Sequence, residues 1–213
     1  MFITFEGIEG CGKSSQARRL ADRLERLGVP LALTLEPGGT RVGREIRRVL
    51  LDSRNQDLLP FAELLLYESD RAQHVKEVIG PALDQGKWVL CDRFFDATTA
   101  YQGYARGQDL AVIQALNERA SCGIRPDITF LLDCPVKVGI KRALKRNEAL
   151  LQKGQDRFER ERVAFHEAVR QGYLTIAGEE PERFVVVDGM LAEEEVETEI
   201  FKHIAPYLPV RGR

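Results

Sequence analysis

The sequence has few of the features that mark metal clusters, disulfide frameworks or membrane spans. Its four cysteines lack CxxC spacing and a partnering histidine pattern, which argues against a zinc site and predicts reduced thiols. No run of about eighteen apolar residues occurs, so we expect no membrane partner. The N-terminus lacks the basic region and long apolar run of a signal peptide, which predicts a cytoplasmic protein. The cysteines are Cys11, Cys91, Cys122 and Cys134.

An excess of charge of one sign is also lacking. The chain has 31 Lys and Arg against 33 Asp and Glu, a formal net charge of -2. A balance this even predicts no polyanion-binding surface, so we expect no nucleic-acid partner. Any anion must instead be held by a local cluster of cations. Repeats and interdomain linkers are absent from the sequence, and its 213 residues predict a single domain, 1–213, with a small lid.

Short apolar runs alternate with longer segments of helical periodicity. The runs are too continuous for half-exposed strands and are typical of strands buried on both faces of a parallel sheet. Segments 14–27 and 58–83 carry apolar residues at helical spacing. This alternation predicts an α/β fold with about five parallel strands flanked by helices. The predicted strands are 2–5, 31–35, 88–91, 128–132 and 184–187.

Polar residues and glycines follow these predicted strands. In parallel α/β sheets, ligands bind at the carboxyl ends of the strands. We therefore expect the chemistry at this edge, and we assign Asp188 to the nucleotide site. The segments at the strand ends are Glu6-Gly7, 36–40, Asp92-Arg93, Asp133 and Asp188-Gly189.

The segment 7–14, GIEGCGKS, fits the phosphate-binding pattern G-x-x-x-x-G-K-[ST]. Glycines let backbone N–H groups wrap phosphates without side-chain clashes. Lys13 is predicted to reach the β- and γ-phosphates and Ser14 to ligate Mg²⁺, at the positive end of a helix dipole. The match follows an apolar strand and opens an amphipathic helix, which predicts a P-loop nucleoside triphosphate hydrolase-like fold. The predicted ATP-binding residues here are Gly7, Ile8, Glu9, Gly10, Cys11, Gly12, Lys13, Ser14 and Ser15.

A second carboxylate supports the metal prediction. The strand at 88–91 is followed by Asp92. P-loop enzymes place such an aspartate near the Mg²⁺ ion, and we expect Asp92 to act through water.

P-loops serve switches, motors, transporters and kinases. The chain contains neither the Asn-Lys-x-Asp of guanine recognition nor the Leu-Ser-Gly-Gly-Gln of transporters. A kinase needs cations for a second phosphate and a closing lid, and both are available. Two alternatives stay open at this point: another nucleotide or nucleoside kinase, and a nucleotide-binding switch that signals through a partner.

The motifs together resemble those of thymidylate kinases, from Phe2 to about Pro206. The resemblance implies transfer of the γ-phosphoryl group of ATP to thymidine monophosphate, for the synthesis of thymidine triphosphate. It also implies a homodimer, for which the apolar residues of 58–66 are available. The motifs that carry it are 7–14, EPGGT at 36–40, 62–75, DRF at 92–94, AYQG at 100–103 and RPD at 125–127.

The resemblance assigns the acceptor site residue by residue. Glu9 is expected to approach the sugar 3′-hydroxyl, and Arg47 and Arg93 to hold the acceptor phosphate. Tyr67 is expected to stack on thymine and Arg71 to donate to its carbonyl. Three further residues are expected at the base and sugar, with the Tyr101 ring crowding the 2′ position: Thr98, Tyr101 and Gln102.

The charged segment 141–162 resembles the lid of bacterial members of the family. There, a lid arginine contacts the transferring phosphoryl group, and the P-loop here contains no arginine. We favour Arg146 for this role over Arg157, and we place Arg142 near the adenine. Alternatively, the segment is a solvated helix face. One departure is Leu35, where many relatives have arginine, which makes the second strand end less basic.

Overall fold

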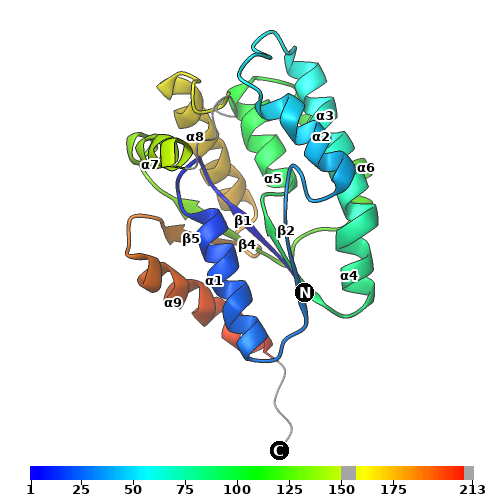
Figure 1. The fold of residues 1–213 in the computed structure, drawn as a ribbon, viewed down its shortest axis with the longest axis vertical. Helices are drawn as coiled ribbons and strands as arrows, with labels where there is room; N and C mark the ends of the chain where they lie inside the picture. The colour runs from blue at the N-terminus through cyan, green and yellow to red at the C-terminus, as the bar shows by residue number, and fades with distance from the viewer. Residues whose placement is uncertain (150–156, 209–213) are drawn as a thin grey trace, which may run out of the picture.

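A five-stranded parallel sheet forms the centre of the computed structural model, which describes residues 1–149 and 157–208 (Figure 1). The strand order is β2-β3-β1-β4-β5, so β1 lies in the middle with β3 and β4 beside it. All five predicted strands and their parallel pairing are confirmed. The strands are β1 (Phe2–Glu6), β2 (Leu31–Leu35), β3 (Trp88–Asp92), β4 (Ile128–Asp133) and β5 (Phe184–Asp188).

Helices cover both faces of the sheet (Figure 1). The helical segments predicted over 14–27 and 58–83 are confirmed, the first as α1 and the second as α3, η1 and α4. A π-helical turn, η1, divides the second segment. Apolar spacing alone does not reveal the wider winding of such a turn. The α-helices are α1 (Lys13–Arg26), α2 (Arg41–Leu51), α3 (Pro60–His74), α4 (Gly80–Asp84), α5 (Phe95–Thr98), α6 (Leu110–Ser121), α7 (Val136–Ala149), α8 (Val163–Glu179) and α9 (Glu193–Ile204). The other helical turns are η1 (Val75–Ile79), η2 (Thr99–Ala105) and η3 (Ala205–Tyr207).

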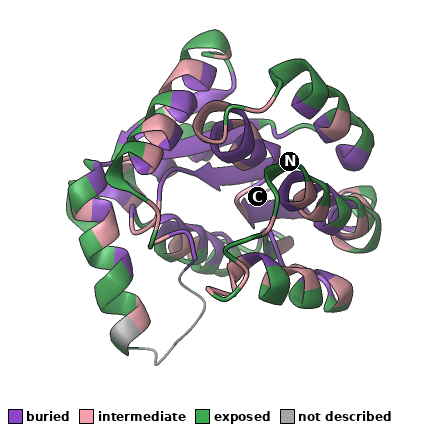
Figure 2. Ribbon diagram, turned by 90° about the horizontal axis from the view of Figure 1, so that it is seen from above, coloured by how far each residue is buried: buried purple, intermediate pink, exposed green. Residues whose placement is uncertain are grey.

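The core lies along the three central strands, which are buried on both faces, as Figure 2 shows. The edge strands differ from the prediction of full burial: Leu33 and Leu35 on β2 are 43% and 40% exposed, and Val186 on β5 is 51% exposed. An apolar run indicates a strand of a covered sheet, but it does not distinguish a central strand from an edge strand.

Among residues 1–149 and 157–208, no helix combines the length and apolar character needed to cross a bilayer.

Candidate active site

The P-loop connects the end of β1 to the start of α1 at the carboxyl edge of the sheet. Gly7 and Gly10 have φ angles of 133° and 71°, in the region that favours glycine. A Cβ atom on Gly7 would lie 2.5 Å from the carbonyl oxygen of Leu132, and one on Gly10 would lie 2.0 Å from that of Gly139. The glycines are therefore required both by the backbone path and by the close approach of β4 and α7.

Lys13 is buried at the start of α1, and its side chain bends back over the loop. Its Nζ atom donates to the carbonyl oxygen of Ile8 at 2.7 Å and lies 3.6 Å from Cys11 Sγ. The ammonium group is thus held at the loop that would surround the phosphates. This arrangement fits the predicted role of Lys13.

Ser14 and Asp92, the two predicted metal ligands, lie together. Strands β1 and β3 pair in parallel with Phe5 opposite Asp92, which brings the end of β3 beside the P-loop. The Ser14 hydroxyl donates to the Asp92 carboxylate. A hydroxyl and a carboxylate are hard oxygen donors, and Mg²⁺ bound with phosphates needs only one or two carboxylates from a protein. The donor set fits Mg²⁺.

One cleft of about 1110 Å³ runs from the P-loop to the acceptor residues. Most predicted site residues line it, whereas Gly7, Ile8 and Asp188 do not. Asp188 accepts the backbone N–H of Met190 at 2.8 Å and closes the turn after β5. The lining includes Glu9, Gly10, Cys11, Gly12, Lys13, Ser14, Ser15, Arg47, Tyr67, Arg71, Asp92, Arg93, Thr98, Tyr101, Gln102, Arg142 and Arg146.

Glu9 in the P-loop contacts residues from three other parts of the chain. Its Oε1 atom accepts from Arg93 Nη2 at 3.0 Å and from the Tyr101 hydroxyl. Its Oε2 atom lies 3.3 Å from Nδ1 of His166 on α8. Burial alone would raise the pKa of Glu9, but His166, Arg93 and Lys13 outweigh it and lower that pKa well below its usual range. Glu9 is therefore a carboxylate at neutral pH.

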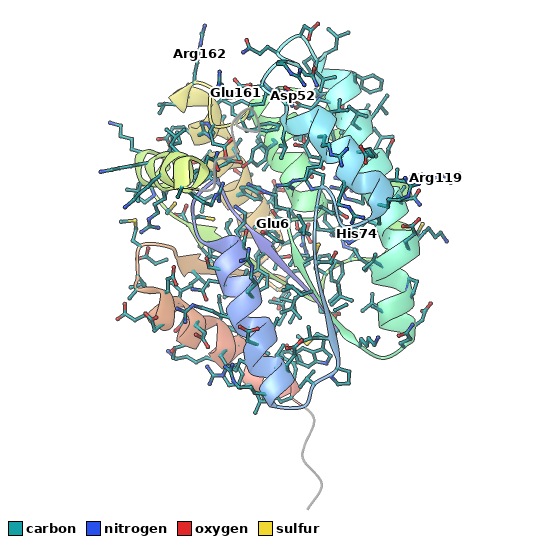
Figure 3. All side chains as sticks on the ribbon, in the orientation of Figure 1. Glu6, Asp52, His74, Arg119, Glu161 and Arg162 are labelled. Atoms are coloured by element: carbon teal, nitrogen blue, oxygen red, sulfur yellow. The ribbon has the colours of Figure 1, made fainter. Side chains whose placement is uncertain are left out.

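Arg93 adopts a left-handed backbone conformation, with a φ of 71°, directly after β3. Its Nη1 atom donates to the Tyr173 hydroxyl and its Nη2 atom to the Tyr101 hydroxyl, both at 2.9 Å. Tyr173 in turn donates to Glu6 at 2.7 Å, near the centre of the molecule (Figure 3). Burial raises the pKa of Glu6. The guanidinium is thus oriented by hydroxyl groups on two sides.

Arg71 on α3 is fully buried and joins several elements. Its guanidinium donates to Glu36 at 3.0 Å and to Glu68, Asn117 and the Thr98 hydroxyl at 2.9 Å each. The same residue lines the cleft. Arg71 and Thr98, predicted separately as base contacts, therefore form one hydrogen-bonded unit.

Other polar groups of the acceptor side are also held by protein partners. Arg47 on α2 donates to the carbonyl oxygen of Pro37 at 2.7 Å, and burial lowers the pKa of its guanidinium. Gln102 on η2 donates to Glu63 of α3 at 2.9 Å. The predicted substrate residues are thus fixed to the loop 36–40 and to α3.

Three aromatic rings form an apolar wall of the cleft. The Phe158 ring centroid lies 6.5 Å from that of Tyr67 and 5.6 Å from that of Tyr101, the latter edge-on. Phe158 is buried and lines the cleft, although it was not among the residues predicted for the site from the sequence. An aromatic residue within a run of charged residues is the one feature of the sequence that could have indicated that Phe158 belongs to the site.

The lid arginines differ in their surroundings. Arg146 is half exposed, lines the cleft and lies 3.7 Å from Glu159, while Arg142 lines it and donates to the Gly189 carbonyl at 2.9 Å. Arg157 is buried, donates to the Leu50 carbonyl at 2.6 Å and pairs with Glu63. Arg157 does not line the cleft. Of the predicted lid, 141–149 belongs to α7 and 150–156 lies outside the described residues.

Comparisons with known proteins agree with this geometry. The sequence model of the family described as Thymidylate kinase matches residues 5–200. Thymidylate kinase of Citrifermentans bemidjiense is 58% identical over 188 residues, 88% of this chain and 84% of that protein. Thymidylate kinase of Trichlorobacter lovleyi is 52% identical over 210 residues, 99% of each chain. A crystal structure of thymidylate kinase from Ehrlichia chaffeensis superposes with a TM-score of 0.76 at 35% identity, covering 96% of this chain and 98% of that one. The chain belongs to the thymidylate kinase family.

Proposed function

We propose that the cleft carries out its family's reaction, phosphoryl transfer from ATP to thymidine monophosphate, with the residue roles given below. The observation that carries this assignment is that Arg93 and Tyr101 both donate hydrogen bonds to Glu9 of the P-loop. A nucleoside monophosphate kinase must hold two anionic groups side by side, whereas a nucleotide switch needs a site for only one. The arginine already oriented beside the P-loop supports a kinase.

On the donor side, the P-loop amides and Lys13 bind the β- and γ-phosphates of ATP, and Ser15 and Arg142 complete the ATP site. Ser14 and Asp92 would hold Mg²⁺, Asp92 through water. When bound, the ion would supply positive charge that neutralises the charge developing on the phosphates. The Ser14 and Asp92 oxygens, already paired, support this assignment.

On the acceptor side, Arg93 and Arg47 hold the phosphate of thymidine monophosphate, since a planar guanidinium can bind two oxygens at once. Glu9 accepts from the sugar 3′-hydroxyl. The base stacks on Tyr67 and contacts the Arg71–Thr98 unit and Gln102. Tyr101 crowds the 2′ position.

The acceptor phosphate oxygen attacks the γ-phosphorus in line, the bond from that phosphorus to the β–γ bridging oxygen breaks, and ADP leaves with the electron pair. The attacking oxygen needs no general base, because a phosphate monoester is largely ionised near pH 7. Positioning and positive charge therefore supply most of the catalysis. Arg146 adds charge at the transferring group, and its exposure at the cleft supports this role. Closure of the lid would exclude water and suppress hydrolysis of ATP.

A panel of nucleoside monophosphates, assayed for ADP release with ATP and Mg²⁺, tests the function. We expect the highest kcat/KM with thymidine monophosphate and little ADP release without an acceptor. Equal or faster turnover of a ribonucleotide would contradict the acceptor assignment. Nucleotide-dependent binding of a partner, with no dependence of turnover on the acceptor, would favour the switch.

We also propose that the chain forms a homodimer through the start of α3. Leu59, Phe61 and Leu65 are 71%, 55% and 42% exposed, and Phe61 and Leu65 are spaced to share one helix face. Phe61→Glu combined with Leu65→Glu should give a monomer in sedimentation velocity. Val186→Glu, at an apolar position of similar exposure on β5, is the matched control and should leave the dimer intact. A wild-type monomer would refute this proposal without affecting the kinase assignment.

A further inference from the structure

A buried histidine outside the cleft lining contacts the P-loop carboxylate. His166 is 0% exposed, and its Nδ1 atom lies 3.3 Å from Glu9 Oε2. Within the part of the chain that the structure describes, neither ring nitrogen of His166 has a hydrogen-bond partner, and Glu9 Oε2 has none either. Buried polar atoms are normally satisfied, and leaving them unpaired destabilises a fold. The imidazole and the carboxylate are therefore adjacent, can act as donor and acceptor, and are incompletely hydrogen-bonded.

The other oxygen of Glu9 is already occupied. Oε1 accepts from Arg93 Nη2 and from the Tyr101 hydroxyl. Because both donors bind Oε1, they hold only one of the two carboxylate oxygens of Glu9. A donor on Oε2 would fix its rotation and direct its remaining lone pairs into the cleft that Glu9 lines.

The same face of α8 also supports the neighbouring arginine. Tyr173 follows His166 by seven residues, two helical turns, and both side chains are fully buried. Tyr173 accepts from Arg93 Nη1 and donates to Glu6. One helix, placed directly after the lid segment, thus contacts both Glu9 and Arg93.

We propose that His166 is a positioning residue that orients the Glu9 carboxylate for the 3′-hydroxyl of the acceptor sugar. The inference rests on the role proposed above for Glu9. His166 does not line the cleft, so it acts through Glu9 rather than by touching the substrate. It supplies an N–H to Oε2, while Tyr101 and Arg93 hold Oε1.

The test compares two acceptors that differ only at the 3′ position, thymidine monophosphate and 3′-deoxythymidine monophosphate. His166→Phe keeps a ring but removes the N–H. A single buried hydrogen bond contributes about 1 to 1.4 kcal/mol, so kcat/KM for thymidine monophosphate should fall about five- to tenfold. The value for the 3′-deoxy acceptor should stay within about twofold, because that acceptor makes no contact with Glu9. His166→Gln, which keeps a side-chain N–H, should restore most of the loss.

Tyr173→Phe is the matched control on the same helix face. It removes the hydroxyl that holds Arg93, the proposed phosphate contact, so it should lower kcat/KM for both acceptors by the same factor. Far-UV circular dichroism and thermal melting establish that each variant is folded. Should His166→Phe not fold, His166→Met replaces it, because a flexible thioether fills a buried space with less strain.

Glu9→Gln separates failure of this inference from failure of the role on which it depends. If Glu9→Gln abolishes the preference for the 3′-hydroxyl while His166→Phe leaves it intact, only the His166 inference is overturned. If Glu9→Gln leaves the preference unchanged, the proposed role of Glu9 is wrong and the inference fails with it. Equal losses with both acceptors in His166→Phe would show a purely structural role and would also overturn it.

Discussion

The proposed donor and acceptor halves of the cleft are built in different ways. The donor half is nearly continuous in sequence: the P-loop, Lys13 and Ser14 follow one another, and Asp92 of β3 and Arg142 of α7 join them from elsewhere in the chain. The acceptor half is assembled from distant segments. Arg93 and Glu9 pair across 84 positions, and Tyr173 and Glu6 across 167.

This difference determines what each half depends on. The donor half requires one strand-loop-helix unit with glycines at positions of positive φ. The acceptor half requires that β1, β3, η2 and α8 all pack correctly, since each supplies one side of the Glu9–Arg93–Tyr101 cluster. Substitutions in the donor half should therefore affect chemistry directly, whereas those in the acceptor half should also change specificity or stability.

The largest expected effect is in the donor half. Lys13→Ala removes the P-loop's full positive charge from a buried position, and kcat should fall by about 10² to 10³. Far-UV circular dichroism should remain native. Lys137→Ala, at an exposed lysine of α7, is the control and should be nearly silent. A folded Lys13→Ala enzyme with near-normal turnover would refute the phosphate-site assignment.

The next effect concerns the lid, which should serve both halves. Arg146→Ala should lower kcat by about a hundredfold, below the 10³ to 10⁵ of supplied arginines in related enzymes because Arg142 lies nearby. KM for thymidine monophosphate should change only a few-fold, as expected for a contact made mainly in the transition state.

Arg157→Ala is the paired variant for the lid. Arg157 pairs with Glu63 away from the cleft, so its loss should lower the melting temperature more than kcat. Steady-state kinetics and melting curves on both variants show whether each substitution changes mainly kcat or mainly the melting temperature. If Arg157→Ala abolishes turnover while Arg146→Ala is silent, the two roles must be exchanged.

A smaller effect is expected on sugar discrimination in the acceptor half. Tyr101→Ala removes the ring proposed to crowd the 2′ position, so the preference for thymidine monophosphate over its ribose counterpart should weaken about tenfold. Tyr101→Phe keeps the ring and loses only the hydroxyl that donates to Glu9. It should keep the preference while lowering both values of kcat/KM. Unchanged discrimination in Tyr101→Ala would rule out this role.

The last expected effect is on stability rather than on turnover and concerns Asp70 of α3. Asp70 accepts the N–H of Gly38 at 3.0 Å through Oδ1, and burial, followed by the nearby Glu36, raises its pKa to about 6. A carboxyl whose pKa is higher in the folded than in the unfolded state loses stability as pH rises from about 4 through 6. Asp70→Asn should therefore stabilise the fold at pH 8 by on the order of 2 kcal/mol, and less at pH 5.

Urea unfolding at the two pH values measures this difference. Asp84→Asn, at an exposed position on α4, is the control and should change the free energy of unfolding by less than about 0.5 kcal/mol at either pH. A stabilisation by Asp70→Asn that did not vary with pH would exclude titration of Asp70 as its cause.

Sequence reasoning predicted best where function follows from local chain chemistry. The P-loop, the five strands and Asp92 at the end of β3 were predicted from residue type and spacing, because glycine conformations and buried apolar runs are local properties. Tyr67, Tyr101 and Arg93 came from the family resemblance, and the structure brings them to one cleft. Phe158, His166 and Tyr173 were missed, since an isolated ring or imidazole on a helix has no local pattern that separates a site residue from a core residue.

The sequence by itself therefore determined the layered α/β architecture and the phosphate loop, because apolar runs and the glycine pattern of the loop are contained in short stretches of neighbouring residues. Only the tertiary structure decided how Glu9 is surrounded, which lid arginine lines the cleft, and that Arg157 is tied to Glu63. Those outcomes depend on where α3, α7 and α8 pack against the sheet. That packing is settled by many weak contacts between segments far apart in the chain, which no short pattern encodes.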